Sequence, residues 1–301
     1  MLIDTHGHVN FNAFREDADE VLQRALADDT WVIMPGSQYS TSKKAVEIAG
    51  NYEKGVYAAI GLHPVHTGEK REVDVMETQG GTSFTTKEEK FDLKSYRSLL
   101  YASKDGQRFF QNRKVVAIGE VGLDYYRLPK NKEAREKEKI TQKNVLREQI
   151  ELALEFDLPI ILHCRAAHEN LLEVLEAPTA KLQTAKLRGV LHSYTGSAEQ
   201  AQKFLEMGLY IGFNGLIFKE VLALPEPAEV ISSIPLERIL LETDSPYLTP
   251  PQAIVGTDPT MRNEPLFVKY VAEEIARIKG ISVEEVASAT TANAKALFRL
   301  I

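Results

Sequence analysis

Histidine and acidic residues follow short apolar runs at several points of the chain, and these residue types are the usual protein ligands of divalent metal ions. His6 and His8 lie two positions apart after the first run, so in an extended segment both side chains project to the same side. Four further residues that can bind metal come at or just after the ends of later runs: Glu120, His163, His192 and Asp244. Each would be weak evidence alone, but together they predict a metal site.

Six nitrogen and oxygen ligands exceed what one tetrahedral ion needs, and they suit two adjacent divalent cations. A carboxylate has two oxygens, so Glu120 is able to bridge both ions. Such a pair lowers the pKa of a shared water molecule toward neutrality. Asp244 then serves as a ligand, as a general base that orients this water, or as both. Glu120 and Asp244 are therefore the predicted catalytic residues.

The elements that must position these residues alternate between strand-like runs and amphipathic helical patterns, as expected of repeated βα units. Helices are predicted over 142–156, 197–207 and 263–280, and a capping box predicts another from Ser282. Eight runs read as strands: 1–5, 31–35, 56–61, 115–119, 159–163, 189–192, 209–212 and 238–241. This pattern favours a closed (β/α)8 barrel of the TIM type, although an open doubly wound sheet gives similar local patterns.

No linker rich in Pro, Gly or Ser divides the chain, so a single domain spanning 1–301 is predicted.

The connection between the third and fourth predicted strands is unusually long. The stretch between His63 and Glu120 is about twice what a helix and its loops need. We expect an insertion at about 67–95, enlarging the loop after the third strand. The weak alternation over 73–86 suggests a small hairpin. The insertion is either a tolerated surface loop or a rim of the substrate groove.

The composition is that of a soluble globular protein of 301 residues with a formal net charge of −7 and one Cys. The acidic balance argues against a bulk electrostatic grip on nucleic acid, but it does not exclude a local one. No apolar run is long enough to span a membrane, and the N-terminus lacks the pattern of an export signal. We therefore expect a cytoplasmic protein without membrane association. No obligate protein partner is evident.

Seven short motifs, read together, resemble the TatD family of metal-dependent deoxyribonucleases, within the wider amidohydrolase-like barrels. They run in family order along the chain: DTHGH at 4–8, GLHP at 61–64, GEVGLDYY at 119–126, HCR at 163–165, HSYTG at 192–196, ETDSPYL at 242–248 and RNEP at 262–265. Only the 67–114 region lacks a clear counterpart. The resemblance implies a (β/α)8 barrel and a hydrolase that cleaves DNA phosphodiester bonds, commonly as a 3′-5′ exonuclease.

The resemblance also implies which residues share each ion. One metal would be held by His6, His8, Glu120 and Asp244, and the other by Glu120, His163 and His192. His63 is placed near the substrate, whereas the role of His66 stays open. The chain departs from the family at Asn10, where an Asp is common; this puts the local loop packing in doubt rather than the ligand set.

Two divalent cations would supply the positive charge that the composition lacks, and phosphate oxygens can complete their coordination. Arg165, Arg127 and Arg262 are predicted phosphate contacts, because a guanidinium group matches the geometry of a phosphate. Tyr125 is a candidate for stacking on an unpaired base. The expected substrate is DNA, single-stranded or with frayed ends.

The sequence leaves open which bond is cleaved, whether the protein turns over a substrate, and which metal it uses. The same ligands polarise carbonyl groups, so a hydrolase of an amide, a lactone or an aminoacyl ester is the alternative function. A binding module without turnover is a third interpretation, against which the complete ligand set speaks. The ligands suit Zn²⁺ or Mn²⁺, whereas phosphate chemistry often uses Mg²⁺.

Of the residues outside the site, His168 is predicted to be exposed on a helix and Cys164 to pack behind its strand.

Overall fold

The computed structural model describes residues 1–69, 72–74, 83–86, 88–104, 107–177, 187–219, 221–254 and 261–300. Its contacts group the chain into two compact units. Unit 1 comprises Met1–Met34, Asp74–Phe84 and Val190–Ile301, and unit 2 comprises Pro35–Val73 and Thr85–Gly189. The single domain inferred from the sequence stays a prediction. Among the described residues, no helix is both long and apolar enough to cross a membrane.

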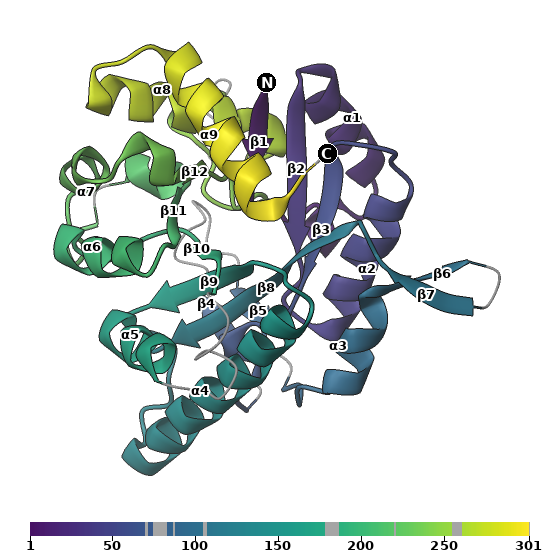
Figure 1. The fold of residues 1–301 in the computed structure, drawn as a ribbon. Helices are drawn as coiled ribbons and strands as arrows, with labels where there is room; N and C mark the ends of the chain where they lie inside the picture. Colours follow the sequence, from purple (N-terminus) through teal and green to yellow (C-terminus); the bar gives the residue numbers. More distant parts are fainter. Residues whose placement is uncertain are drawn as a thin grey trace. The chain divides into compact units, whose positions relative to one another are not determined.

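Unit 1 is built on short parallel strands that helices cover (Figure 1). The strands are β1 (Leu2–Asp4), β2 (Thr30–Pro35), β10 (Gly189–Leu191), β11 (Tyr210–Phe213) and β12 (Ile239–Leu241). The helices are α1 (Ala18–Ala27), α6 (Ala198–Glu206), α7 (Pro227–Ser233), α8 (Val268–Lys279) and α9 (Val283–Phe298). Helices α8 and α9 both pack against β1 and β12. As predicted, Ser282 closes a capping box at the start of α9, and Gly280 ends α8 in the left-handed conformation.

Unit 2 contains three parallel strands, β3 (Val56–Ile60), β8 (Val115–Asp124) and β9 (Ile160–Arg165). Its helices are α2 (Tyr39–Gly50), α3 (Leu93–Leu99), α4 (Lys132–Glu155) and α5 (His168–Glu176). Helix α2 packs on β3 and α4 packs on β8. Every residue of β3 and β8 is buried, as in parallel strands that are covered on both faces.

The fold class predicted from the sequence is confirmed. Eight strands follow one another in chain order: β1, β2, β3, β8, β9, β10, β11 and β12. Each of them leads into a helical segment before the next begins. Parallel strands in sequence order with intervening helices are the topology of a (β/α)8 barrel. All eight runs identified in the sequence coincide with these strands to within a few residues.

Two of the predicted strand ends are wrong. Strand β8 does not stop at Gly119 but continues through Glu120 to Asp124, and β9 continues through His163 to Arg165. The apolar pattern stops at the first polar ligand, whereas the backbone ladder does not depend on side-chain polarity. Glu120 and His163 therefore lie inside strands, where the backbone on both sides fixes their direction.

The enlarged loop after β3 contains two small two-stranded sheets. Strands β4 (Glu72–Asp74) and β5 (Ser83–Thr85) form a two-stranded sheet, in agreement with the expected hairpin, although Gly80 and Gly81 lie outside the described residues. A second hairpin, β6 (Tyr101–Lys104) and β7 (Gln107–Gln111), was not predicted, and it extends away from α3 in Figure 1. The charged residues between and within its strands mask the period-two pattern.

His168 corrects one expectation. It begins α5, as predicted for a helical residue, but only 9% of its surface is exposed. The helical pattern could not show which side of α5 faces the interior at its first residue. Burial lowers the pKa of His168 to about 4. Cys164 is buried as expected, and burial raises the pKa of its thiol.

The buried imidazole of His168 predicts a loss of stability in acid. Below its ordinary pKa of 6.5 the unfolded chain binds a proton at this residue, but the folded chain does not do so until about pH 4. The contribution of His168 to the free energy of unfolding therefore falls as the pH falls through this window, by about 2 kcal/mol between pH 7.5 and pH 5. Urea unfolding of the metal-free protein at these two pH values measures the effect. The variant His168→Gln should lack that part of the pH dependence, and an unchanged difference would contradict the assignment.

Candidate metal centre

Unit 1 brings together four of the predicted ligands, from the ends of three strands. His6 and His8 follow β1, His192 follows β10, and Asp244 lies three residues beyond the end of β12. The Asp244 backbone N–H donates to the carbonyl of His6, which ties the two segments together. Donor atoms of His6, His192 and Asp244 lie within 4.8 Å of one another.

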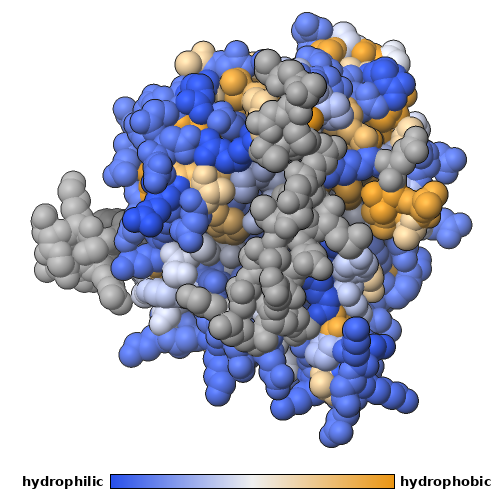
Figure 2. Space-filling view, turned by 180° about the vertical axis from the view of Figure 1, so that it is seen from behind, coloured by the Kyte–Doolittle hydropathy of each residue, from blue (hydrophilic) through white to orange (hydrophobic). Residues whose placement is uncertain are grey.

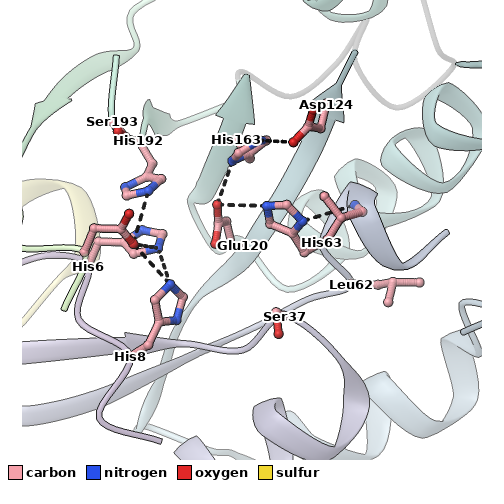
Figure 3. A network of polar contacts seen from close by, with 12 residues as sticks. His6, His8, Ser37, Leu62, His63, Glu120, Asp124, His163, His192 and Ser193 are labelled. Atoms are coloured by element: carbon pink, nitrogen blue, oxygen red, sulfur yellow. Dashed lines mark hydrogen bonds and ion pairs between the residues drawn. The ribbon is translucent and has the colours of Figure 1, made fainter. Parts of the chain in front are cut away.

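Three imidazole rings converge on one carboxylate oxygen in this cluster, which Figure 3 shows for the histidines. The Nε2 atoms of His8, His192 and His6 lie 3.3, 3.7 and 3.9 Å from Asp244 Oδ1. Burial alone would raise the pKa of Asp244, but the hydrogen bond from His8 and the nearby imidazoles of His192 and His6 hold that pKa below its usual value. Asp244 is thus an ionised carboxylate surrounded by nitrogen atoms that could bind a metal ion together with it.

A buried carboxylate, Glu242, sets the orientation of His192. Its Oε2 accepts from His192 Nδ1 at 2.8 Å and from the Ser193 backbone N–H at 2.9 Å. With the proton on Nδ1, the lone pair of His192 lies on Nε2, the atom that faces Asp244. This arrangement fits a divalent cation, because it presents an imidazole nitrogen in the form that binds metal.

The backbone leaves room for that carboxylate. At Gly212, opposite Leu240 in β12, a Cβ atom would collide with the Glu242 carboxylate. Ser193 and Asp244 both hold positive φ angles, of 46° and 55°. Non-glycine residues in this region cost on the order of 1–3 kcal/mol, and such strain is concentrated at functional sites.

Glu242 is therefore predicted to control metal affinity. We expect Glu242→Gln to weaken metal binding and activity about 10- to 100-fold, as for other partners that orient metal-bound histidines. Competition with a chromophoric chelator measures the affinity, and Glu237→Gln, an exposed acidic residue of the same unit, is the control. Gly212→Ala should reproduce the loss without touching a ligand. Wild-type affinity in Glu242→Gln would show that His192 needs no such support.

A second buried carboxylate, Asp4, joins β1 to the segment after β12. It accepts from Thr243 Oγ1 at 2.6 Å and from the backbone N–H groups of Thr243 and His6 at 2.9 and 3.2 Å. Complete burial raises the pKa of Asp4 to about 7. Asp4 thereby fixes the positions of His6 and of the Thr243–Asp244 segment relative to each other.

Unit 2 holds the other predicted ligands around Glu120, which lies between His63 and His163 (Figure 3). Glu120 Oε1 is 2.9 Å from His163 Nδ1 and 3.3 Å from His63 Nε2. The Glu120 backbone N–H donates to Gly36, and a Cβ at the neighbouring Gly122 would collide with the His163 carbonyl. Glu120, His63 and His163 form a second set of residues that could hold a cation.

His63 differs from the other histidines in the way its proton is placed. Its Nδ1 accepts from the Val65 backbone N–H at 3.1 Å, so in the neutral ring the proton lies on Nε2, next to Glu120. Burial lowers the pKa of His63, which keeps the ring neutral. In this state His63 donates a hydrogen bond, a property that suits an anion or a carboxylate better than a metal ion.

Asp124 is a partner that the sequence did not single out. Its Oδ2 lies 3.4 Å from His163 Nε2 and 3.2 Å from Arg127 Nη1. Burial works against ionisation of Asp124, but the hydrogen bond from His163 and the charges of His163 and Arg127 hold its pKa well below the usual value. The same carboxylate bonds raise the pKa of His163 against the effect of burial.

The residues predicted to contact the substrate differ in the partners that their side chains have in the structure. Arg127 is bound to Asp124, and Arg262 pairs with Asp17 at 2.6 Å and with Glu264 at 3.2 Å. The Arg165 guanidinium lies 4.2 Å from the centre of the Tyr126 ring, a side chain that is 53% exposed. Tyr125 is half-buried, with its hydroxyl 3.3 Å from Asn170. Of these side chains, Arg165 is the one placed on an exposed aromatic ring.

Comparison with known proteins identifies the family. The family model described as "TatD related DNase" matches residues 3–299. The chain belongs to this family. It is 38% identical over 304 residues to the uncharacterized metal-dependent hydrolase YabD of Bacillus subtilis, with all of both chains covered. It is 30% identical over 300 residues to the protein of Erwinia tasmaniensis named 3'-5' ssDNA/RNA exonuclease TatD, covering 99% of this chain and 100% of that one.

Solved structures of TatD homologues have the same fold. The crystal structure of the TatD homologue YJJV of Escherichia coli matches with a TM-score of 0.74 and 27% identity, covering 100% of this chain and 98% of that one. A TatD family hydrolase of Entamoeba histolytica matches with a TM-score of 0.73 and 25% identity, covering 99% of this chain and 97% of that one. This TatD-family chain is thus a metal-dependent hydrolase, and its His, Glu and Asp clusters are the residues that could bind the metal.

Proposed function

We propose that this TatD-family hydrolase is a 3′-5′ exonuclease that cleaves phosphodiester bonds in single-stranded or frayed DNA. The convergence of three imidazole Nε2 atoms on Asp244 Oδ1 carries the proposal, because it fits a divalent cation. Relatives of about the same length that bear the name 3'-5' ssDNA/RNA exonuclease support the nucleic-acid substrate.

The proposed cation ligands are those expected from the sequence: His6, His8, Glu120, His163, His192 and Asp244. Two divalent ions, Zn²⁺, Mn²⁺ or Mg²⁺, would supply Lewis acidity, which activates water and neutralises charge on the phosphate. The pKa of Asp244 is held low, so this carboxylate is ionised and would accept a proton from a water held by the ions. Glu242 and Asp124 keep His192 and His163 in the orientation that this reaction needs.

The residues proposed to bind the substrate are His63, Arg165, Arg127, Tyr125 and Arg262. His63 donates from Nε2 and is suited to a phosphate oxygen, and Arg165 with Tyr126 offers a cationic aromatic surface. Arg262 and Arg127 already neutralise carboxylates, so a phosphate at these positions would compete with Asp17 or Asp124. We expect the contributions of Arg165 and His63 to be the larger ones.

A substrate panel tests this function. Oligonucleotides labelled at the 5′ end, as single-stranded DNA, double-stranded DNA and RNA, are compared with ester, lactone and amide substrates at equal enzyme and metal concentrations. The proposal predicts stepwise shortening of single-stranded DNA, and slower cleavage of blunt duplexes. Turnover of the carbonyl compounds without cleavage of any nucleic acid would replace it with the alternative hydrolase, since the same ligands can polarise a carbonyl group.

A further inference from the structure

Unit 1 contains a pocket at the ends of β10 and β11, close in the chain to the His192 ligand. The loop after β10 contributes Tyr194, two residues beyond His192, and the end of β11 contributes Phe213 and Asn214. Leu216 and Ile217 of the following helical turn also line it. About 550 Å³ of atom-free space lies in and in front of this hollow, open solvent included. The hollow is therefore open to a ligand from the solvent side.

The pocket is lined by aromatic and aliphatic side chains together with Thr195, Lys219 and Glu226, and its Tyr194 wall is held in place. Tyr194 is 8% exposed, and its hydroxyl donates to the Ser197 carbonyl at 2.8 Å. At Gly196 a Cβ atom would collide with the Tyr194 hydroxyl oxygen. The phenol ring is therefore positioned before any ligand arrives, which reduces the entropy that binding would cost.

Asn214 provides one polar group with an unused donor. Its Oδ1 accepts from the Leu216 backbone N–H at 3.1 Å, and this bond fixes which end of the amide is oxygen. The Asn214 side chain is 1% exposed, and among the described residues its Nδ2 has no acceptor. A buried donor without a partner is unfavourable, so the site is best satisfied by a ligand that brings an acceptor.

The rim of the pocket exposes apolar side chains. Val221 and Leu224 line the pocket and are 40% and 36% exposed, and Leu222 between them is fully exposed. Figure 2 shows that apolar surface gathers in a few patches on an otherwise hydrophilic face. Exposed apolar groups beside an aromatic pocket are typical of a site for a ring-shaped ligand.

We propose that this pocket receives the base of the 3′-terminal nucleotide of the substrate strand. The inference rests on the proposed function. Tyr194 follows His192 by two residues, at most about 7 Å away between Cα atoms, and we therefore place the phosphate at His192 and the base beside Tyr194. The ring contacts Tyr194, Phe213 and Leu216, and Asn214 Nδ2 donates to a base carbonyl or ring nitrogen.

The buried Asn214 donor suits every base. All four bases carry at least one acceptor on an exposed edge, and discrimination between them needs a second, differently placed group. Stacking on an aromatic ring is likewise tolerant of sequence. The pocket would therefore recognise that a terminal base is present rather than which base it is.

Binding without turnover tests the pocket separately from the nuclease activity. Fluorescence anisotropy in EDTA compares two single-stranded oligonucleotides, one complete and one lacking only the 3′-terminal base. We expect the complete strand to bind about 10-fold more tightly, within the range of base–aromatic stacking. Asn214→Asp, which keeps the acceptor for Leu216 but removes the donor, and Ile217→Trp, which fills the pocket, should both reduce this ratio toward one. Asn144→Asp, on the exposed face of α4, should leave it unchanged.

The outcomes separate the two proposals. Equal binding of the two oligonucleotides by the wild-type protein, including no binding of either, overturns the pocket even if the enzyme degrades DNA. A ratio that both pocket variants leave unchanged overturns it too. Base-dependent binding by a protein that cleaves no nucleic acid supports the pocket and refutes the exonuclease.

Discussion

Replacement of Glu120 by alanine should lower kcat/KM on single-stranded DNA by more than about 100-fold, exceeding the loss expected for residues that only orient a ligand. Glu120 is 4% exposed, and its Oε1 contacts both His163 and His63. Removal of the carboxylate takes away a proposed cation ligand and leaves His163 Nδ1 without this acceptor. We therefore expect the variant to bind less metal as well as to turn over slowly.

The measurement combines metal analysis with kinetics. Glu120→Gln keeps the shape of the side chain and should show the same loss, so that a cavity cannot explain it. Glu173→Ala removes an exposed glutamate of unit 2 that pairs with Lys143, and it should have nearly wild-type activity because surface ion pairs contribute little. A Glu120→Ala protein that is fully loaded with metal and nearly as fast as wild type would contradict the assignment.

Replacement of Asp244 by asparagine should have a comparable effect, with a loss in kcat/KM of more than about 100-fold. The substitution removes the negative charge on which the Nε2 atoms of three histidines converge, while it keeps the side chain almost the same size. The pKa of Asp244 is held low, so its charge is present throughout the neutral range. Without that charge, the nitrogen donors face one another and hold a cation less firmly.

Circular dichroism should show that Asp244→Asn folds normally, and equilibrium dialysis should show weaker metal binding. Asp28→Asn, at the exposed end of α1, makes the same chemical change in unit 1 and should alter neither. Normal metal content with a reduced kcat would assign Asp244 to proton transfer rather than to binding. Normal metal content with a normal kcat would exclude it from the site.

The fold was largely predictable because few fold classes accommodate eight apolar runs that alternate regularly with helical patterns. The apolar pattern could not give the lengths of β8 and β9, since Glu120 and His163 interrupt the apolar runs without interrupting the strands. The same limitation applies to α4, whose first turns are highly charged and exposed, so that its apolar stripe becomes visible only from Gln142 onward.

The residues proposed as metal ligands stand out in the sequence by their positions after strands, but the carboxylates that support them do not. Asp4, Asp124 and Glu242 are buried and hydrogen-bonded, yet in the sequence they resemble solvated acidic residues. The spacing could have indicated two of them, because Asp4 lies two positions from His6 and Glu242 lies two positions from Asp244. At that spacing in an extended segment, two side chains face the same side. The direction of the His63 proton depends on the Val65 backbone and could not be read from the sequence.

Chelation followed by metal restoration tests whether a divalent ion drives cleavage of DNA from its 3′ end. The protein is treated with EDTA, dialysed, and assayed on single-stranded DNA labelled at the 5′ end, with and without added Mg²⁺, Mn²⁺ or Zn²⁺. We expect no cleavage in the metal-free protein and a ladder of products that shorten from the 3′ end once one of these ions is restored. Equal degradation with and without divalent metal, or release of the 5′ label as a mononucleotide in the first turnover, would contradict it.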